Sequence, residues 1–297
     1  RNYTGFYQWA SVYFHDPLFS RYAGGTAAPG AASPPPRSAD LKGVGVATLR
    51  RGEGTNAVCA MIDYGIHGGG HGHPDKLSIV LFALGQEYVL DPGRISYSVP
   101  EYSTWCRTTI AHNTVTINKR DQEPATGELW YFQETNAWTA CLCATDKAYP
   151  GYLLKRFLVL TDDLLVDVFT VEGEKKAVLD WTMHCRGGMT SNLAFKPAEP
   201  LGVENGYQHL RSVQTAKGAD AAWLSFEKTP GKPLRIVLAG DEGSTIFSGA
   251  GIGYRLDDAV PFLIRRRMGS ATAFVTVYDL SGGSGPELRV ERVPIKA

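Results

Sequence analysis

The sequence predicts a mainly β protein built as one large antiparallel β-sandwich. Roughly a dozen short segments are apolar or alternate apolar with polar residues, and Gly, Pro, Asn or Asp separates them at the spacing typical of strands and turns. Helical periodicity is confined to the beginning of the chain. Self-similarity at a fixed period is missing from the sequence, which disfavours a propeller or a solenoid.

The beginning of the chain differs from the rest. Residues 5–22 are rich in aromatic side chains at partly helical spacing, and a proline interrupts the pattern, so we expect one short helix that ends near Phe14. The Gly-, Ala- and Pro-rich segment 24–38 then predicts a stiff, extended linker. The expected domains are therefore residues 1–38 and 39–297.

The strands are expected in the larger of these domains. Two apolar runs flank Thr161-Asp162-Asp163, whose acidic residues predict the turn of a β-hairpin. The predicted strands cover residues 44–49, 56–63, 77–83, 88–90, 114–117, 153–160, 164–169, 178–184, 221–226, 234–238, 262–267, 271–278 and 288–293.

The composition is that of a globular protein without a global charge. Of the 297 residues 43% are hydrophobic, and 30 basic side chains balance 30 acidic ones, so no overall field attracts the chain to nucleic acid, a membrane or an acidic polymer. Five cysteines are too few for a disulfide scaffold, which leaves the redox compartment open. Cys141 and Cys143 would share one face of a strand, which favours two small core residues over a zinc knuckle.

Three charged motifs have ordinary structural interpretations. The run 265–267 consists of arginines in an alternating strand, and we interpret it as a solvated sheet edge rather than a polyanion site. The adjacent carboxylates Asp162 and Asp163 could suggest a hydrolase, but their turn position favours a solvated hairpin tip. Asp75 follows a proline and is expected to cap the turn that leads into Lys76.

Polar chemistry concentrates between residues 64 and 114. Four of the seven histidines lie there: His67, His71, His73 and His112. In an extended segment His71 and His73 would point to the same side, and Asp91 and His112 could complete a site of imidazoles and one carboxylate. This donor set suits zinc and does not suit calcium or magnesium. From the spacing alone, a set of hydrogen-bonded loop histidines is an equal alternative.

Several motifs in this region follow one another in a fixed order. They are Gly-Gly-Gly-His-Gly-His-Pro-Asp-Lys-Leu-Ser-Ile at 68–79, Leu-Asp-Pro-Gly at 90–93, Trp-Cys-Arg-Thr-Thr-Ile-Ala-His-Asn-Thr at 105–114 and Leu-Asp-Trp-Thr-Met-His at 179–184. In this order they resemble the heparinase II/III-like family of polysaccharide lyases, which includes oligoalginate lyases. The resemblance covers roughly residues 40–190.

The resemblance implies a two-part architecture. In this family an amino-terminal (α/α) toroid precedes a large antiparallel β-sandwich of the galactose-mutarotase-like type, called a super-sandwich, and the active site lies in the cleft between them. The chain matches the sandwich, so the helix expected before residue 15 would be the last piece of the toroid, and the rest of the toroid would be a missing partner. Because residue 1 is internal in character, we expect a lyase fragment that is inactive alone.

The resemblance also implies a structural zinc site. His73, Asp91 and His112 match the zinc-binding positions of the family, where the metal braces the loops beneath the cleft. His71 matches a residue that points into the cleft and helps to neutralise the substrate carboxylate, so it is a candidate catalytic residue.

Four further residues are candidates for contact with a substrate. Tyr97, Tyr102 and Arg107 lie in a loop that lines the cleft in relatives, which makes the tyrosines catalytic candidates and Arg107 a substrate-binding candidate; His184 is a second substrate-binding candidate. The alternatives are packed loop aromatics, an arginine bonded to loop carbonyls and a satisfied core histidine.

The implied reaction is β-elimination on a uronate-containing glycan of the alginate or glycosaminoglycan type. A base removes the C5 proton once donors neutralise the adjacent carboxylate, and an acid, usually a Tyr hydroxyl, protonates the departing O4. In relatives the toroid carries the principal Tyr and its Asn or His partner. The alternative function is a noncatalytic carbohydrate-binding or structural sandwich that keeps the metal core. An acidic polysaccharide substrate favours a periplasmic or secreted location.

Overall fold

The computed structural model describes residues 4–14, 19, 37–283 and 288–290. The chain divides into two compact units, Arg1–Pro36 and Arg37–Ala297. In the first unit α1 spans Thr4–Phe14, which confirms the short helix expected there. The predicted linker lies largely outside the described residues, and the assignment of α1 to a toroid stays a prediction. Within the described part of the chain, every helix is too short or too polar to cross a bilayer.

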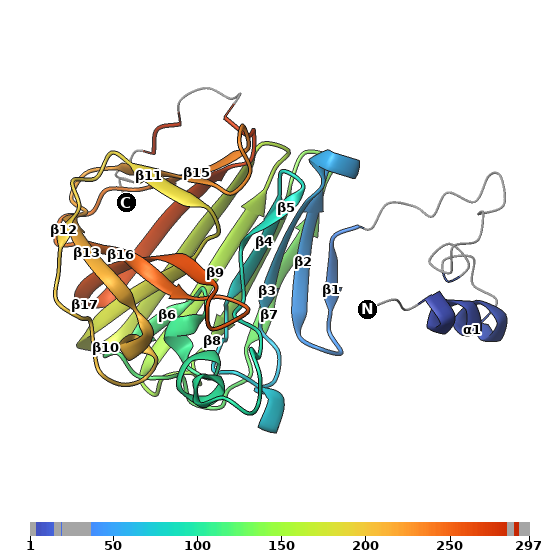
Figure 1. Cartoon of the computed structure of the whole chain (residues 1–297), viewed down its shortest axis with the longest axis horizontal. Helices are drawn as coiled ribbons and strands as arrows, with labels where there is room; N and C mark the ends of the chain where they lie inside the picture. The colour runs from blue at the N-terminus through green and yellow to red at the C-terminus, as the bar shows by residue number, and fades with distance from the viewer. Residues whose placement is uncertain (1–3, 15–18, 20–36, 284–287, 291–297) are drawn as a thin grey trace. The chain divides into compact units, whose positions relative to one another are not determined.

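The second unit contains two antiparallel sheets (Figure 1). The smaller sheet has its strands in chain order: β1 (Ala39–Leu41), β2 (Val46–Arg51), β3 (Val58–Asp63), β4 (Ile79–Ala83) and β5 (Gln86–Val89). Every pairing in it joins strands that follow each other directly. The sheet is therefore a simple meander. Polar residues of the site lie in its connections: His73 and Asp75 between β3 and β4, and Asp91 after β5.

The larger sheet has 12 strands, of which eight lie in the order β11-β14-β15-β17-β10-β9-β8-β7. The strands of this sheet are β6 (Val115–Ile117), β7 (Glu128–Glu134), β8 (Thr139–Thr145), β9 (Tyr152–Leu160), β10 (Leu164–His184), β11 (Gly188–Ser191), β12 (Lys196–Pro197), β13 (Arg211–Lys217), β14 (Ala222–Glu227), β15 (Pro233–Leu238), β16 (Thr245–Ile252) and β17 (Ala259–Asp279). Single helical turns interrupt the loops: η1 (Gly54–Asn56), η2 (Gly69–His71), η3 (Tyr102–Cys106), η4 (Thr109–Ala111) and η5 (Tyr207–His209).

The main hydrophobic core contains side chains from both sheets. Alternate residues of the small sheet, such as Ile62 and Leu81, belong to the same buried cluster as Leu158 and Phe169 of the large sheet. Burying each side chain of this size stabilises the fold by about 1.5–3 kcal/mol. Cys141 and Cys143 of β8 are also part of this core, as expected. The predicted large antiparallel β-sandwich is therefore confirmed.

Two long strands form the middle of the large sheet. β10 and β17 each have 21 residues and pair from Leu164 with Asp279 to His184 with Phe262, with one register shift after Glu172. Each long strand was predicted as two short ones, because a polar stretch interrupts its apolar pattern. That prediction is wrong, since the polar residues extend both strands through the irregularity.

The arginine run at 265–267 is not a solvated edge, so that interpretation is wrong. β17 has hydrogen-bonded neighbours on both sides, and all three guanidinium groups have partners inside the protein. Arg265 is buried and donates to main-chain carbonyls, Arg266 binds the buried Asp180 through two contacts of 2.7 Å, and Arg267 pairs with Asp241.

The predicted hairpin is confirmed, and the last predicted strand is not found in the described residues. The hairpin predicted around Asp162 joins β9 to β10, and the exposed Asp162 carboxylate lies 2.7 Å from Arg51. Residues 288–290 are not in a strand, and the rest of the strand predicted at 288–293 lies outside the described residues.

Candidate functional site

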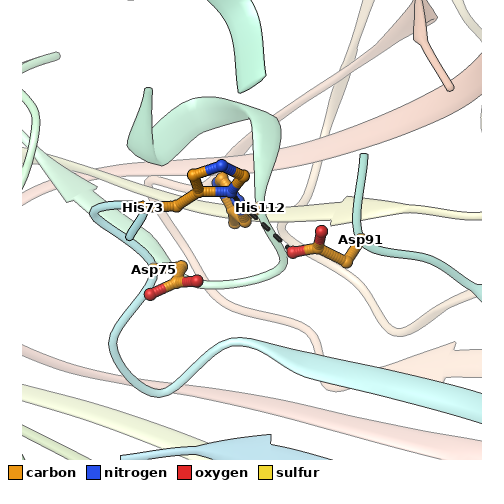
Figure 2. A group of neighbouring side chains, drawn as sticks. All are labelled: His73, Asp75, Asp91 and His112. Carbon is orange, nitrogen blue, oxygen red and sulfur yellow. Dashed lines mark hydrogen bonds and ion pairs between the residues drawn. The ribbon is translucent and has the colours of Figure 1, made fainter. Parts of the chain in front are cut away.

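Three separate connections bring four potential metal ligands together (Figure 2). His73 and Asp75 lie between β3 and β4, Asp91 follows β5, and His112 lies between η4 and β6. Figure 2 shows the two imidazole rings next to each other, with both carboxylates close by. One potential ligand atom from each residue lies within 4.8 Å of all the others.

The spacing of the donor atoms fits a tetrahedral metal. His73 Nδ1 lies 3.2 Å from His112 Nε2, and His112 Nε2 lies 3.3 Å from Asp91 Oδ2. Ligands about 2.0–2.1 Å from a tetrahedral zinc ion are separated by about 3.3 Å along each edge. The two measured separations thus match two edges of such a tetrahedron, and Asp75 or water would complete the site.

Hydrogen bonds outside the cluster orient two of the ligands. His112 Nδ1 donates to the Thr108 carbonyl at 2.9 Å, so the lone pair of Nε2 faces the cluster. Asp91 Oδ1 accepts the Gly93 amide at 2.7 Å, which leaves Oδ2 for the cluster. This arrangement of outer hydrogen bonds is typical of metal ligands, because it fixes the tautomer and the direction of each donor atom.

The protonation of the cluster also favours a cation. Burial and the neighbouring His112 lower the pKa of His73, although Asp91 and Asp75 oppose the shift, so the imidazole is held neutral. Burial disfavours ionisation of Asp75, but His112 and Lys76 outweigh it and lower the pKa of Asp75. The surroundings therefore favour the neutral form of His73 and the ionised form of Asp75, which are the forms that bind metal.

Asp75 is the member of the cluster that the sequence interpretation missed. It was expected only to cap a turn, whereas its carboxylate lies among the ligands and 3.1 Å from the buried Lys76 ammonium. Lys76 also lies 2.7 Å from Asp63 Oδ2. The His-Pro-Asp spacing was the one signal in the sequence that could have included Asp75, because residues two apart can point to one side.

His71 and His73 contact different partners, although the ring of each lies next to one member of the same tyrosine pair. His71 ends the single turn η2, is exposed, and contacts Tyr97, whereas His73 contacts His112. The chain is so tight here that a Cβ on Gly72 would lie 1.3 Å from the His67 carbonyl oxygen. Only glycine therefore permits the turn that separates the two imidazoles.

An exposed aromatic group adjoins the metal cluster. His71 Nδ1 lies 3.0 Å from the Tyr97 hydroxyl, and the Tyr97 and Tyr102 rings meet edge to face with centroids 4.8 Å apart. The guanidinium of Arg94 covers Tyr97 at 5.0 Å. Tyr97 is 51% exposed and Tyr102 only 9%, so Tyr97 is the tyrosine that solvent, or a glycan, can reach. Tyr102 belongs to the π-helical turn η3, a type of turn that is frequent at functional sites.

The two predicted substrate-binding residues lie in different surroundings. Arg107 is half-buried, and its charge acts on His73. His184 is 2% exposed, and its Nε2 lies 2.8 Å from the Ile110 carbonyl. Burial lowers the pKa of His184 to about 4. The structure places His184 beneath the surface, packed edge to face against Trp105, so its role in substrate binding stays a prediction.

The sandwich fold agrees with the family to which the chain belongs. Residues 33–229 match the family model of the heparinase II/III-like C-terminal domain, and the chain is a member of that family of polysaccharide lyases.

Individual relatives are larger proteins. An exo-oligoalginate lyase of Saccharophagus degradans is 28% identical over 233 residues, which cover 64% of this chain and 32% of the relative. An alginate lyase of Stenotrophomonas maltophilia is 27% identical over 259 residues, which cover 77% of this chain and 31% of the relative. The heparan sulfate lyase HepC from Pedobacter heparinus superposes with a TM-score of 0.71 at 17% identity, over 93% of this chain and 41% of that chain. The chain thus spans about a third of the length of the two alginate-acting relatives.

Proposed function

We propose that this chain is the β-sandwich part of a polysaccharide lyase that cleaves a uronate-containing glycan by β-elimination. The observation that carries the proposal is the pairing of two neighbouring sites: a partly buried His and Asp cluster fit for a metal, and an exposed His71–Tyr97 pair next to it. Family membership supplies the class of reaction, and the names of the relatives point to alginate or heparan sulfate as substrates. An acidic polysaccharide substrate supports a periplasmic or secreted location.

We further propose that the cluster binds zinc and that the ion has a structural role. His73, Asp91 and His112 would hold it, and the bound ion would supply a fixed joint between the three connections that carry them. Because the same connections lead into the turn with His71 and into the loop with Tyr97, the joint would keep these two side chains at a constant separation.

The exposed pair would take part in the elimination itself. His71 and Arg107 would neutralise the uronate carboxylate, which makes the C5 proton acidic. Removal of that proton forms the C4–C5 double bond as the C4–O4 bond breaks, and a hydroxyl such as that of Tyr97 returns a proton to O4. Tyr97 is better placed for this transfer than Tyr102, because Tyr102 is buried beneath it. The missing toroid would supply the opposite wall and the remaining acid or base.

An assay with two forms of the protein tests this proposal. The form that includes the sequence upstream of residue 1 is expected to increase the absorbance of unsaturated uronate with alginate, heparan sulfate or chondroitin sulfate, and residues 1–297 alone to give no increase. Tyr97→Phe in the longer form should lower kcat about 10²–10⁴-fold. Tyr131→Phe is the matched control, because Tyr131 is also an exposed tyrosine but lies on β7.

A second candidate function follows from the fact that the chain covers only about a third of the length of its alginate-acting relatives. A sandwich that spans about a third of a lyase could bind carbohydrate or act as a structural module without chemistry. Retention of the longer form on immobilised alginate without any unsaturated product would support this alternative and contradict the lyase proposal.

A further inference from the structure

The ligands of the candidate metal site come from three connections that no main-chain ladder joins at the site. His73 and Asp75 precede Leu77, Asp91 follows Leu90, and His112 precedes Asn113. Something other than secondary structure must therefore keep the three segments at the right separation. Two buried polar side chains, Arg156 and Asn113, bond to all three segments.

Arg156 extends from β9 of the large sheet toward the ligand connections. It is 0% exposed, and its Nε and Nη2 bind the two oxygens of the equally buried Asp167 at 2.9 and 2.6 Å. Its remaining terminal nitrogen, Nη1, donates to the carbonyls of Leu77 and Asn113. The planar guanidinium can direct donors to a carboxylate on one side and to two carbonyls on the other, a geometry that lysine cannot reproduce.

Asn113 continues the connection to the third segment. Its side-chain nitrogen donates to the Leu90 carbonyl and to the Ile79 carbonyl, both at 2.8 Å, and its side-chain oxygen accepts the His184 amide at 2.7 Å. The bond to Leu90 holds the residue directly before Asp91. Both donor hydrogens of the amide are thus used between segments that carry or flank ligands.

The segment held by Arg156 is under local strain. Leu77 has φ of +62°, a left-handed conformation that costs a non-glycine residue roughly 1–2 kcal/mol. Such a conformation persists where surrounding contacts determine it, and here the Leu77 amide donates to Asp63 while its carbonyl accepts from Arg156. The backbone between His73 and β4 is therefore shaped by its partners and not by its own preference.

We propose that Arg156 and Asn113 are positioning residues that preset the three ligand segments, so that the metal enters a site already formed. This inference rests on the metal-binding role given under the proposed function. Neither residue is within the cluster of ligands, and both act through main-chain carbonyls next to ligands. The metal affinity of the site depends on them, because any relaxation of the segments must be reversed when the ion binds.

Titration with Co²⁺, followed by its visible absorption and by competition with a chelator, tests the inference. Arg156→Lys and Asn113→Ala are each expected to raise the Kd for Co²⁺ about 10–100-fold, the usual effect of removing an outer partner of metal ligands. Arg265→Lys is the matched control, because Arg265 is also a buried arginine but donates to Ala239 and Val275. The Kd of the Arg265→Lys variant for Co²⁺ should change less than about 3-fold, even if its melting temperature falls as much as that of the Arg156→Lys variant.

Hydrogen exchange of the unsubstituted protein provides a readout that does not require the variants to fold. The amides of Lys76, Leu77 and Asn113 lie in the ligand segments and donate to Gln122, the Asp63 carbonyl and Ser78, respectively. If the segments are preset, these amides should stay protected after the metal is removed by a chelator. Loss of their protection on chelation would mean that the metal organises the segments, which would overturn the inference.

The remaining outcomes separate this inference from the proposed function. An unchanged Kd in folded Arg156→Lys and Asn113→Ala, with normal Co²⁺ binding by the unsubstituted protein, overturns the positioning role alone. Absence of Co²⁺ binding by the unsubstituted protein refutes the metal site, and the inference with it. A lyase assay without product leaves the Co²⁺ result unaffected, because binding is measured without substrate.

Discussion

His112 and His184 are both buried histidines, yet they offer different nitrogens to their surroundings. His112 uses Nδ1 for a main-chain carbonyl and faces the ligand cluster with Nε2. His184 uses Nε2 for the Ile110 carbonyl, and its buried Nδ1 has no hydrogen-bond partner in the described part of the chain. The first arrangement suits metal binding, whereas the second holds a neutral ring in the core.

The residue types and their spacing predicted the candidate metal ligands but not the buried side chains that hold the ligand segments. His73, Asp91 and His112 were expected from the order of motifs, and the structure brings them together. No supporting role was predicted for Arg156 or for Asn113, which belongs to the motif at 105–114, because their partners are distant along the chain and a single Arg or Asn carries no periodic signal. Long-range hydrogen bonds of this kind follow from the packing of the two sheets, which spacing does not encode.

The neutral His184 predicts a specific sensitivity to acid. Its pKa falls from 6.5 to about 4 in the folded protein, so the unfolded chain binds the extra proton first as the pH falls below 6.5. The contribution of this residue to stability is complete above pH 6.5 and is lost as the pH falls to 4 and below, by about 3 kcal/mol in total. His184→Gln, which cannot titrate, should therefore lose less stability than the unsubstituted protein between pH 7.5 and 4.5.

Urea unfolding at both pH values, with a chelator present throughout, measures this difference. The chelator removes any contribution of bound metal, and the other titrating groups cancel when the two proteins are compared. Equal losses of stability in the two proteins would show that the neutral form of His184 is not favoured by the fold.

At the scale of elements, β10 connects several parts of the large sheet through one carboxylate. Asp180 is 0% exposed and accepts bonds from Arg266 of β17 and, at 2.6 Å, from the Tyr207 hydroxyl of η5. The Tyr207 hydroxyl also lies 2.7 Å from Thr116 of β6. A buried carboxylate with three donated bonds is well satisfied, and each donor loses its partner if the carboxylate is removed.

Apolar alternation predicted strands well only where one face of a strand is buried. β9 was found almost to the residue, because its buried and half-buried residues alternate along the whole strand. The predicted strands did not include β7, β8, β13 and β16. Most side chains of β7 and β13 are exposed or half-buried and give no apolar pattern, whereas β8 is almost wholly buried and shows no alternation. The segments between the predicted halves of β10 and β17 lack an apolar pattern for the same reason. Main-chain pairing with a neighbour forms these segments, and a single sequence does not show it.

Substitution of Asp180 should destabilise the sandwich strongly. Asp180→Ala leaves the charge of Arg266 and the Tyr207 hydroxyl unpaired, and we expect the free energy of unfolding to fall by about 3–5 kcal/mol. Glu172→Ala on the same strand is the control, because Glu172 pairs with Lys155 at the surface, and its loss should cost less than about 1 kcal/mol. Urea denaturation monitored by fluorescence gives both values, and similar losses in the two variants would contradict the assignment.

At the scale of the whole molecule, the order of the motifs predicted more than composition did. Composition and turn spacing indicated a sandwich, and the ordered motifs identified the heparinase II/III-like family, which residues 33–229 confirm. The partner domain and its cleft stay predictions, because the chain spans about a third of its alginate-acting relatives.

Metal removal should lower the stability of the whole sandwich. A ligand that binds only the folded state at about 100 times its Kd contributes about 2.7 kcal/mol, which corresponds to about 5–10 °C in Tm for a domain of this size. We expect chelation to lower the Tm by this amount, His73→Ala to abolish the difference, and His71→Ala, outside the cluster, to retain it. Zinc-free protein by elemental analysis, with a Tm that a chelator does not change, would exclude the structural metal.

The pairing of β10 with β17 has a consequence for how the protein folds. Leu164 pairs with Asp279, and β11 to β16 lie between these strands in the chain, so the centre of the large sheet closes only by contact between distant segments. Folds with such high contact order form slowly, because the entropy of a long loop is lost before the pairing stabilises it. During synthesis β10 is made long before its neighbour, and until Ala259–Asp279 leaves the ribosome one side of β10 is an open edge that favours aggregation.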